Sequence, residues 1–298
     1  MNVLLVGCNG FIGSHLAQRF MDLGYHVTGC DLGASSWVQI QAYFQVSDIQ
    51  LHQNASMWAR QYDICINASG SGEVARSLKT PLLDFELNCT LTLNVLEAIK
   101  MSQRKCKHVF FSSAAVYGES YGQRSVPSPV SPYGWNKRIG ELLCEQYQSL
   151  FGIESLAVRP FSVYGPGLRK QLFWEMARKM TSNGNIQAFG TGEELRDYVY
   201  VDDVVDAIVW LLNKPWKGVG AIDIGTGVPT RIKDVVEMVA KHYLRTKNEV
   251  EFTGTGMPGS PNCLVASQVP EILCDFQFKT SLVEGVERTI NWIKTIDN

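Results

Sequence analysis

The feature that most constrains the fold of this chain is a cluster of glycines between two apolar segments near the N-terminus. Asn2–Val6 is apolar after its first residue and reads as a buried strand, whereas Phe11–Leu23 has the apolar spacing of a helix. Three glycines follow the strand and open the helix: Gly7, Gly10 and Gly13. A strand that passes through a glycine turn directly into a helix is the first half of a βαβ unit, so we predict a parallel sheet covered by helices.

Short apolar runs and helical stretches alternate along the first half of the chain. Further strands are expected at 26–30, 64–67, 108–112 and 156–159, and further helices at 83–100 and 132–150. After Gly165 the segments become shorter, with helices expected at 172–181, 204–212, 232–243 and 282–293 and strands at 186–189 and 221–225. We therefore expect an α/β fold with a Rossmann-type, doubly wound parallel sheet in residues 1–165. A smaller C-terminal α/β lobe for the substrate is expected in residues 166–298, with segments near 197–225 returning to the first domain.

The glycine turn also predicts a cofactor. Because it carries few side chains, a pyrophosphate can approach the backbone at the helix N-terminus, where free N–H groups and the helix dipole bind phosphate. Asp31 ends the second strand about 20 residues further on, and its carboxylate suits the hydroxyl pair of a ribose. Between Asp31 and Arg60 the chain has no Arg or Lys to hold a 2′-phosphate. The sequence therefore predicts NAD as the cofactor, and no metal site is expected.

Tyr133 and Lys137 lie four residues apart within the predicted helix 132–150. This spacing places the phenol and the ammonium one turn apart on the same helix face. A lysine charge near a phenol favours the phenolate, so we expect the pKa of Tyr133 to fall from about 10 towards neutrality. Such a tyrosine accepts a proton from a hydroxyl group at physiological pH.

Composition excludes several other classes of function. The 298 residues carry a net charge of −2, which gives no basic surface for nucleic acid or an anionic membrane. Residues 1–6 lack the charged start of a signal peptide, and no apolar stretch approaches the roughly 18–20 residues of a membrane span. The eight cysteines form no C-x-x-C pair. We expect a cytoplasmic protein with a small-molecule substrate.

Taken in order, these motifs resemble the extended short-chain dehydrogenase/reductase family, in particular its NAD-dependent nucleotide-sugar epimerases, dehydratases and 4-keto reductases. The further segments that carry the resemblance are Asp48-Ile49, Asn67-Ala68-Ser69-Gly70, Asn88 with the six residues after it, Ser112–Gly118, Arg159–Pro166 and Arg196–Asp203. The resemblance covers nearly the whole chain.

The resemblance implies a role for each matching residue. The catalytic residues are Ser113, whose hydroxyl bonds the reacting sugar oxygen, Tyr133 as acid and base, and Lys137, which binds the nicotinamide ribose. The implied cofactor contacts come from Gly7, Gly10, Phe11, Ile12, Gly13, Asp31, Asp48, Ile49, Asn67, Ala68, Ser69, Asn88, Tyr133, Lys137 and Pro160. The implied substrate contacts come from Ser113, Tyr133, Ser162, Arg169 and Arg196, with Tyr164 as a further candidate. Arg196 is expected to bind the diphosphate of a nucleotide sugar, since its planar fork matches phosphate oxygens.

Two departures from the family pattern narrow the function. Dehydratases of this family have Asp-Glu directly after the catalytic Ser or Thr, where this chain has Ala114 and Ala115, which cannot exchange protons. The family often has Asn at the position of Ser162, so the identity of the sugar stays open.

Our first hypothesis is therefore an NAD-dependent epimerase that acts at C4 of a UDP- or dTDP-linked sugar through a transient 4-keto intermediate. The alternative is an NAD(P)H-dependent 4-keto-6-deoxysugar-nucleotide reductase that uses the same three residues. A dinucleotide sensor without activity is a third possibility, but Tyr133 and Lys137 are both present. The family also implies a homodimer formed through the helices at 83–100 and 132–150.

Overall fold

The computed structural model describes residues 1–33, 42–45, 53, 55–58, 60–119, 126–181, 186–216, 220–243 and 250–297. Its strands are β1 (Asn2–Val6), β2 (His26–Asp31), β3 (Ala42–Gln45), β4 (Ile64–Asn67), β5 (Lys107–Phe111), β6 (Ser155–Pro160), β7 (Ser162–Tyr164), β8 (Ile186–Ala188), β9 (Leu195–Arg196), β10 (Tyr198–Tyr200), β11 (Ile222–Ile224), β12 (Thr230–Arg231), β13 (Val250–Phe252) and β14 (Cys263–Leu264). Its α-helices are α1 (Phe11–Asp22), α2 (Ala55–Trp58), α3 (Val74–Lys79), α4 (Pro81–Phe85), α5 (Leu91–Ser102), α6 (Pro132–Phe151), α7 (Gln171–Met180), α8 (Val201–Leu212), α9 (Ile232–His242) and α10 (Leu282–Asp297).

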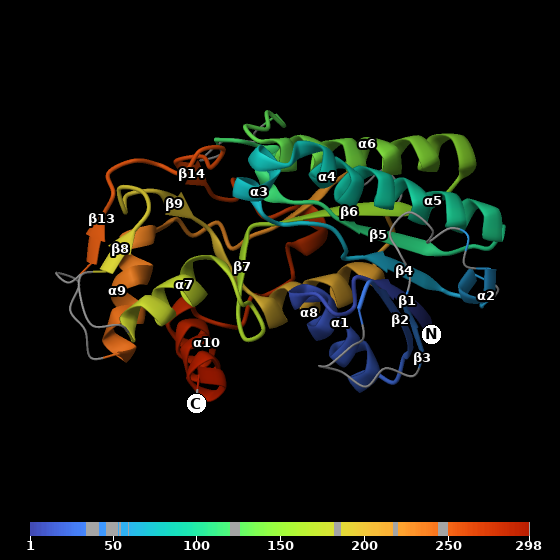
Figure 1. The fold of residues 1–298 in the computed structure, drawn as a ribbon. Coiled ribbons are helices and arrows are strands. Elements are labelled where there is room, and N and C mark those ends of the chain that lie inside the picture. Colours follow the sequence, from blue (N-terminus) through green and yellow to red (C-terminus); the bar gives the residue numbers. More distant parts are fainter. Residues whose placement is uncertain are drawn as a thin grey trace.

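A seven-stranded parallel sheet forms the centre of the larger part of the molecule (Figure 1). Its strand order is β3-β2-β1-β4-β5-β6-β11, and the first six strands have the order of a dinucleotide-binding sheet. The seventh strand, β11, comes from late in the chain and pairs with β6, with Ile222 opposite Val158. The prediction of a Rossmann-type, doubly wound parallel sheet is confirmed.

Different helices cover the two faces of this sheet because alternate residues of a strand point in opposite directions. Val3 and Leu5 of β1 pack in the core formed with α1 and α8, whereas Leu4 and Val6 pack in the core formed with α5 and α6. Figure 1 shows α1 and α8 below the sheet and α5 and α6 above it. Each such fully buried aliphatic side chain contributes about 1.5–3 kcal/mol to folding. The carboxyl ends of the strands face the second part of the molecule.

The second part has its own core between α7, α9 and α10. Phe173, Val236 and Ile290 are buried there, one from each helix. Short strand pairs, β7 with β10 and β8 with β13, and the set β12-β9-β14 complete this lobe. Within the described residues, no helix is long and apolar enough to span a membrane.

The structure differs from the prediction of one uninterrupted helix over 83–100. The segment consists of α4, a π-helical turn at Glu86–Thr90, and α5. The turn buries Asn88 and Cys89 and leaves Glu86 exposed. Apolar spacing cannot reveal such a turn, because one wide turn changes the helical period only locally, and π turns are frequent at functional sites.

Candidate active site

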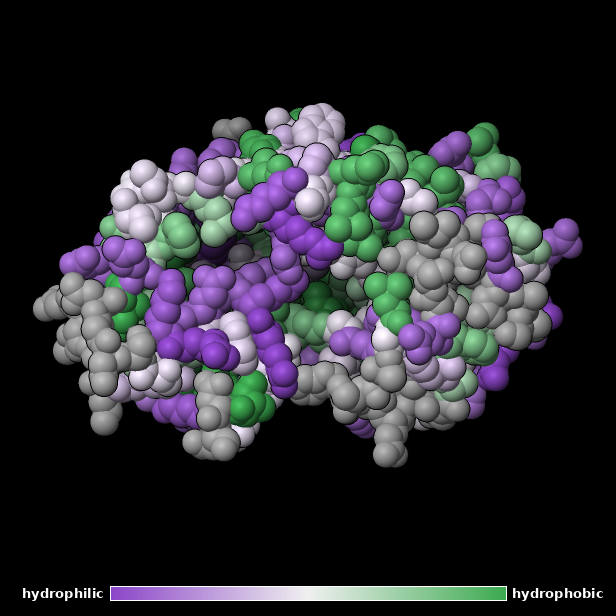
Figure 2. Space-filling model, in the orientation of Figure 1, coloured by the Kyte–Doolittle hydropathy of each residue, from purple (hydrophilic) through white to green (hydrophobic). Residues whose placement is uncertain are grey.

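A cavity of about 750 Å³ lies at the carboxyl ends of the central strands, between the sheet and the smaller lobe. Figure 2 shows the molecule hollowed near the centre of this face, with hydrophobic residues in the hollow. Residues that follow β4, β5 and β6 line one side, among them Ser69, Ser113 and Ser162, and Arg196 and Tyr198 of the lobe line the other. Ligands of open α/β sheets bind at this edge, so this cavity is the candidate site.

The predicted glycine motif forms the turn between β1 and α1. Gly7 has φ +84°, and a Cβ atom there would lie 2.7 Å from the backbone of Ser69. A Cβ atom on Gly13 would overlap the carbonyl oxygen of Gly7. Gly10, Phe11 and Ile12 line the cavity. Glycine at these positions is therefore required both for the turn and for the close approach of α1 to the sheet.

Asp31 lies at the end of β2, beside this turn. Its two carboxylate oxygens accept hydrogen bonds from the backbone N–H groups of Asn9 and Leu32, each at 2.8 Å. These bonds fix the carboxylate and leave it further lone pairs for hydroxyl donors. The structure thus places Asp31 next to the glycine turn, as the sequence predicted, whereas Asp48 and Ile49 lie outside the described residues.

Asn67 and Asn88 lie behind the turn that follows β4. Asn67 is 1 % exposed, and its Oδ1 accepts hydrogen bonds from the backbone N–H and the hydroxyl of Ser69. These bonds fix the turn, in which Ala68 and Ser69 line the cavity. Asn88 is also 1 % exposed, and its Oδ1 has no hydrogen-bond partner among the described residues. Asn67 and Asn88 do not line the cavity themselves, but a Cβ atom on Gly70, which lines it, would lie 2.5 Å from Asn88 Oδ1. A buried acceptor without a partner therefore lies directly behind the cavity lining.

The start of α6 is built to bring Tyr133 to Ser113. Ser131 caps the helix by accepting from the N–H of Gly134 at 3.2 Å, and Pro132 occupies the first turn. A Cβ atom on Gly134 would lie 2.5 Å from the carbonyl oxygen of Ala115, so the helix packs directly against the segment after Ser113. Ser113, Tyr133 and Lys137 all line the cavity, and Ala114 and Ala115 line it beside them.

The expected lowering of the pKa of Tyr133 is wrong. Burial raises the pKa of Tyr133 to about 12, although the hydrogen bond with Ser113 acts in the opposite direction. Burial also lowers the pKa of Lys137 to about 8. The Nζ of Lys137 donates to the carbonyl oxygen of Phe111 at 2.9 Å and lies 6.0 Å from the centre of the Tyr133 ring. Desolvation of the phenol is therefore the largest effect on the pKa of Tyr133, and the charge of Lys137 is not among the causes of the shift.

On the lobe side, Arg196 has no carboxylate within 4.0 Å among the described residues. Its Nη1 donates to the carbonyl oxygens of Leu195 and Asn262, and its Nη2 donates to Ser260 Oγ and the Pro261 carbonyl. Burial lowers the pKa of the guanidinium. A partly buried cation whose charge is not neutralised by an acid is suited to an anionic ligand.

The segment 256–263, which we call the strap, belongs to the smaller lobe and contacts the Rossmann part of the molecule. Glu119 accepts hydrogen bonds from the backbone N–H groups of Asn262 at 2.5 Å and Cys263 at 2.9 Å. Gly259 of the strap is so close to α3 that an added Cβ atom would lie 3.1 Å from Val74. Sequence reasoning missed Glu119, because only the fold brings it to Asn262, which lies 143 residues further along the chain.

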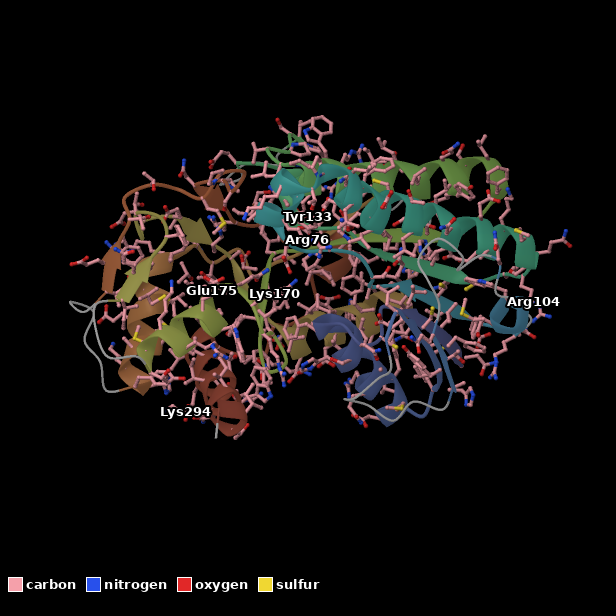
Figure 3. The ribbon with its side chains drawn as sticks, viewed as in Figure 1. Arg76, Arg104, Tyr133, Lys170, Glu175 and Lys294 are labelled. Atoms are coloured by element: carbon pink, nitrogen blue, oxygen red, sulfur yellow. The ribbon has the colours of Figure 1, made fainter. Side chains whose placement is uncertain are left out.

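Two other residues that we expected to contact the substrate, Arg169 and Tyr164, do not line the cavity. Arg169 is exposed and does not line the cavity, whereas its neighbour Lys170 does and lies 3.6 Å from Glu73. Tyr164 is 1 % exposed and stacks on Phe173 inside the lobe core. Figure 3 shows Lys170 on the lobe side of the molecule, across from Tyr133.

Behind the cavity lies a buried ionic cluster that sequence analysis did not anticipate. Glu141 accepts from Arg159 through two hydrogen bonds of 2.6 and 2.7 Å and from Ser112 at 2.6 Å. Arg159 also donates to Tyr117, which donates to Asp223 of β11 at 2.8 Å. The cluster ties α6 to Ser112, which follows β5, and to β6 and β11, so it fixes the strand ends next to Ser113.

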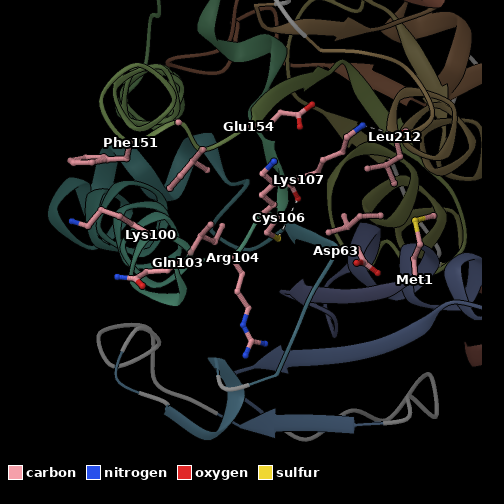
Figure 4. Close-up of a pocket in the computed structure, with 15 residues that line it drawn as sticks. Met1, Asp63, Lys100, Gln103, Arg104, Cys106, Lys107, Phe151, Glu154 and Leu212 are labelled. Atoms are coloured by element: carbon pink, nitrogen blue, oxygen red, sulfur yellow. Dashed lines mark hydrogen bonds between the residues drawn. The ribbon is translucent and has the colours of Figure 1, made fainter.

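A second, larger cavity of about 900 Å³ lies at the opposite end of the sheet (Figure 4). Met1, Asp63 and Lys107 line it, and these residues lie at the amino ends of β1, β4 and β5. None of the predicted site residues lines this cavity. Because ligands of such sheets bind at the carboxyl ends, the chemistry belongs to the smaller cavity.

Comparison with known proteins agrees with this geometry. Residues 3–225 match the model of the "NAD dependent epimerase/dehydratase family". UDP-glucuronate 4-epimerase of Thermodesulfobacterium geofontis is 27% identical over 98% of this chain and 95% of its own. The crystal structure of UDP-glucuronic acid 4-epimerase from Bacillus cereus with UDP-glucuronic acid and NAD has TM-score 0.87 and 27% identity over 99% of this chain and 100% of its own.

UDP-glucose 4-epimerase of Thermotoga maritima, solved with UDP-glucose, has TM-score 0.90 and 25% identity over the full length of both chains. The family match covers most of the chain and includes the glycine turn and the residues Ser113, Tyr133 and Lys137 that line one cavity. The chain therefore belongs to the NAD-dependent epimerase/dehydratase family.

Proposed function

We propose that the protein is an NAD-dependent epimerase that inverts C4 of a UDP-linked sugar through a transient 4-keto sugar. The observation that carries the proposal is that Ser113, Tyr133 and Lys137 line the same cavity as the glycine turn. Ala114 and Ala115 lie at the positions where a dehydratase needs acids. The names of the relatives support UDP as the nucleotide and C4 as the reacting carbon.

In this reaction Tyr133 takes the proton from the sugar O4, and Ser113 donates a hydrogen bond to the same oxygen. Lys137, held by the Phe111 carbonyl, binds the nicotinamide ribose and keeps a positive charge beside the phenol. NAD⁺, when bound, would supply the acceptor and donor of the C4 hydride, and the glycine turn and Asp31 would hold it. The 4-keto sugar turns in the cavity so that the hydride would be added to the opposite face of C4, which inverts this carbon. Tyr133 then returns its proton to O4, and the sugar undergoes no net oxidation.

We propose that the sugar turns in this cavity between the two hydride transfers. Its volume of about 750 Å³ lies well within the range of small-molecule sites. We propose that Arg196 binds the diphosphate from the lobe side and that Ser162, which lines the cavity, contacts the sugar. We also propose the division at residue 165, with β11 returning to the first domain; its pairing with β6 supports this.

We further propose that the protein acts as a cytoplasmic homodimer. Large apolar side chains are exposed along the outer face of the helices that would form the contact: Leu82 at 72 %, Phe85 at 42 %, Met101 at 63 %, Trp135 at 55 %, Leu142 at 47 % and Leu150 at 64 %. Figure 2 shows hydrophobic residues gathered over α4 to α6. Several large exposed apolar side chains on helices that pack together favour a protein interface. No disulfide joins the eight cysteines, which agrees with a reducing compartment.

The proposal is tested by incubating the purified protein with UDP-glucose, UDP-N-acetylglucosamine and UDP-glucuronic acid, first without added cofactor and then with NAD. We expect the C4 epimer of at least one sugar and no net change in the absorbance of reduced cofactor. Stoichiometric oxidation of NADH or NADPH by a 4-keto-6-deoxysugar nucleotide, without C4 interconversion of any UDP sugar, would contradict the epimerase and support the reductase.

A further inference from the structure

A buried carboxylate lies between α4 and α6, and the reaction proposed above does not use it. Asp84 interrupts the apolar run Leu82-Leu83-Asp84-Phe85 and is 2 % exposed. Its Oδ2 accepts a hydrogen bond from Asn136 Nδ2 at 2.8 Å. Its Oδ1 has no hydrogen-bond partner among the described residues. Burying a carboxylate with an unpaired oxygen destabilises the folded state. We therefore expect Asp84 to have a function.

The surroundings of Asp84 hold it in a fixed place. Asn88 donates from Nδ2 to the Asp84 carbonyl at 3.1 Å, and the Cys89 thiol donates to the carbonyl of Asn136 at 3.3 Å. The π-helical turn that carries Asn88 and Cys89 therefore ties the backbone of α4 to that of α6. The carboxylate is aimed at the first two turns of α6, where Tyr133 and Lys137 lie.

Lys137, the residue after Asn136, lacks a close acidic partner. It is 4 % exposed, and no carboxylate lies within 4.0 Å of its Nζ in the part of the chain that the structure describes. The only hydrogen bond found for Nζ among these residues goes to the Phe111 carbonyl. Asp84 is the buried acid of α4 that bonds to Asn136, the residue next to Lys137 in α6.

We propose that Asp84 is a positioning residue that keeps Lys137 protonated beside Tyr133 and, through its bond to Asn136, fixes the start of α6. The inference rests on the proposed epimerase function for its kinetic consequence, but the charge on Lys137 can be measured without any substrate. Asp84 touches neither substrate nor cofactor in this account and acts only through the two catalytic groups.

The electrostatic environment of the two groups supports this role. Burial lowers the pKa of Lys137 to about 8, and among the charges that raise it Asp84 has the largest effect, followed by Cys89 and Glu141. Asp84 also raises the pKa of Tyr133, on which the Ser113 hydrogen bond acts in the opposite direction. The remaining charged groups on elements packed against Asp84 are Arg76 and Lys79 of α3, Glu86 of the π turn, and Arg138 and Glu145 of α6. All are exposed except Arg138, which is partly buried and pairs with Glu141 and Glu145. Without the charge of Asp84, both catalytic groups should lose their protons at lower pH.

The direct test is an NMR titration of Lys137 with lysine isotope-labelled at Cε, assigned with Lys137→Arg, in the protein with and without saturating NAD. In Asp84→Asn, which keeps an oxygen to accept from Asn136, we expect the pKa of Lys137 to fall by on the order of one pH unit. Glu86→Gln removes an exposed carboxylate from the adjoining turn and should leave the titration unchanged. An unchanged pKa of Lys137 in Asp84→Asn would overturn the proposal, and Asp84→Ser gives the same measurement if Asp84→Asn does not fold.

The pH profile of kcat/KM for C4 epimerisation gives the second readout. In Asp84→Asn both limbs of the profile should move to lower pH, and activity on the alkaline side should fall by about tenfold for each pH unit that the alkaline limb moves. A uniform loss of activity at every pH, with both limbs in place, would mean that Asp84 only supports packing and would contradict the proposal. If the protein does not epimerise any sugar, the proposed function fails while the NMR titration still decides the role of Asp84.

Discussion

Lys137 Nζ lies 6.0 Å from the centre of the Tyr133 ring but donates its hydrogen bond to the Phe111 carbonyl oxygen, 2.9 Å away. The ammonium is therefore held by β5, and among the bonds of the described residues none joins it to the phenol oxygen. Burial raises the pKa of Tyr133 and lowers the pKa of Lys137, so each group resists the charge that the reaction needs. Asp84 raises the pKa of both groups, so it favours the charged form of Lys137 but opposes the charged form of Tyr133.

Lys137→Met should stabilise the fold near pH 7 while it abolishes activity. The pKa of Lys137 is lowered from 10.5 to about 8 in the folded chain, so the unfolded chain binds more protons between these values. Below about pH 8 the buried ammonium therefore lowers the free energy of unfolding. This destabilisation disappears as the pH rises through 8 towards 10.5. We expect the free energy of unfolding to rise by about 1–3 kcal/mol at pH 7, measured in urea.

Lys79→Met, at an exposed position of α3, is the matched control and should leave stability nearly unchanged. A Lys137→Met protein less stable than the wild type at pH 7 would show that the bond to Phe111 outweighs the cost of burying the charge.

Gly134→Ala should separate Tyr133 from Ser113. The added Cβ atom would lie 2.5 Å from the Ala115 carbonyl and 3.0 Å from Pro129 Cβ, so α6 has to move away from the segment 114–116. A displacement of this size is expected to lower kcat by on the order of 100-fold. Steady-state kinetics checks this against Gly220→Ala, where the new methyl group meets no atom within 4 Å. Equal kcat in the two variants would contradict the close packing at Gly134.

Much of this arrangement followed from the sequence, because its causes are local. The glycine turn, Asp31 at a strand end and the helix face shared by Tyr133 and Lys137 depend on spacings within a few residues or one βαβ unit. The π turn was missed because it alters the helical period only over Glu86–Thr90. Glu119 and the Glu141–Arg159 pair were missed because their contacts join distant segments. The prediction for the pKa of Tyr133 was wrong because burial depends on the whole fold, which a sequence pattern does not measure.

Glu119→Gln should loosen the strap over the cavity. The carboxylate accepts two backbone N–H bonds from Asn262 and Cys263, and a neutral amide forms weaker bonds and offers only one accepting oxygen. Because Arg196 binds the same strap, we expect KM for the UDP sugar to rise by about 3–10-fold, with a smaller change in kcat. Initial rates against substrate concentration measure this, with the exposed Glu251→Gln of β13 as the control. Unchanged KM in Glu119→Gln would argue that the strap does not hold the substrate.

Leu142→Glu should dissociate the proposed homodimer. Leu142 is 47 % exposed on α6, in the apolar face that the dimer would bury, and a carboxylate there would lose its hydration on association. Sedimentation velocity should give the dimer for the wild type and the monomer for Leu142→Glu. Val283→Glu, on the 66 % exposed Val283 of α10, should remain dimeric. A wild-type protein that sediments as a monomer at all concentrations would refute the dimer.

The central claim is that one protein-bound dinucleotide removes the C4 hydride and returns it to the same sugar. It is tested most directly with UDP-glucose and UDP-glucuronic acid that carry deuterium at C4, incubated with the NAD-loaded protein and followed by NMR. We predict a C4 epimer that keeps its deuterium at C4, formed about 10²–10⁴-fold more slowly by Tyr133→Phe. A C4 epimer whose deuterium has exchanged with solvent, or no C4 epimer from either sugar, would contradict the account.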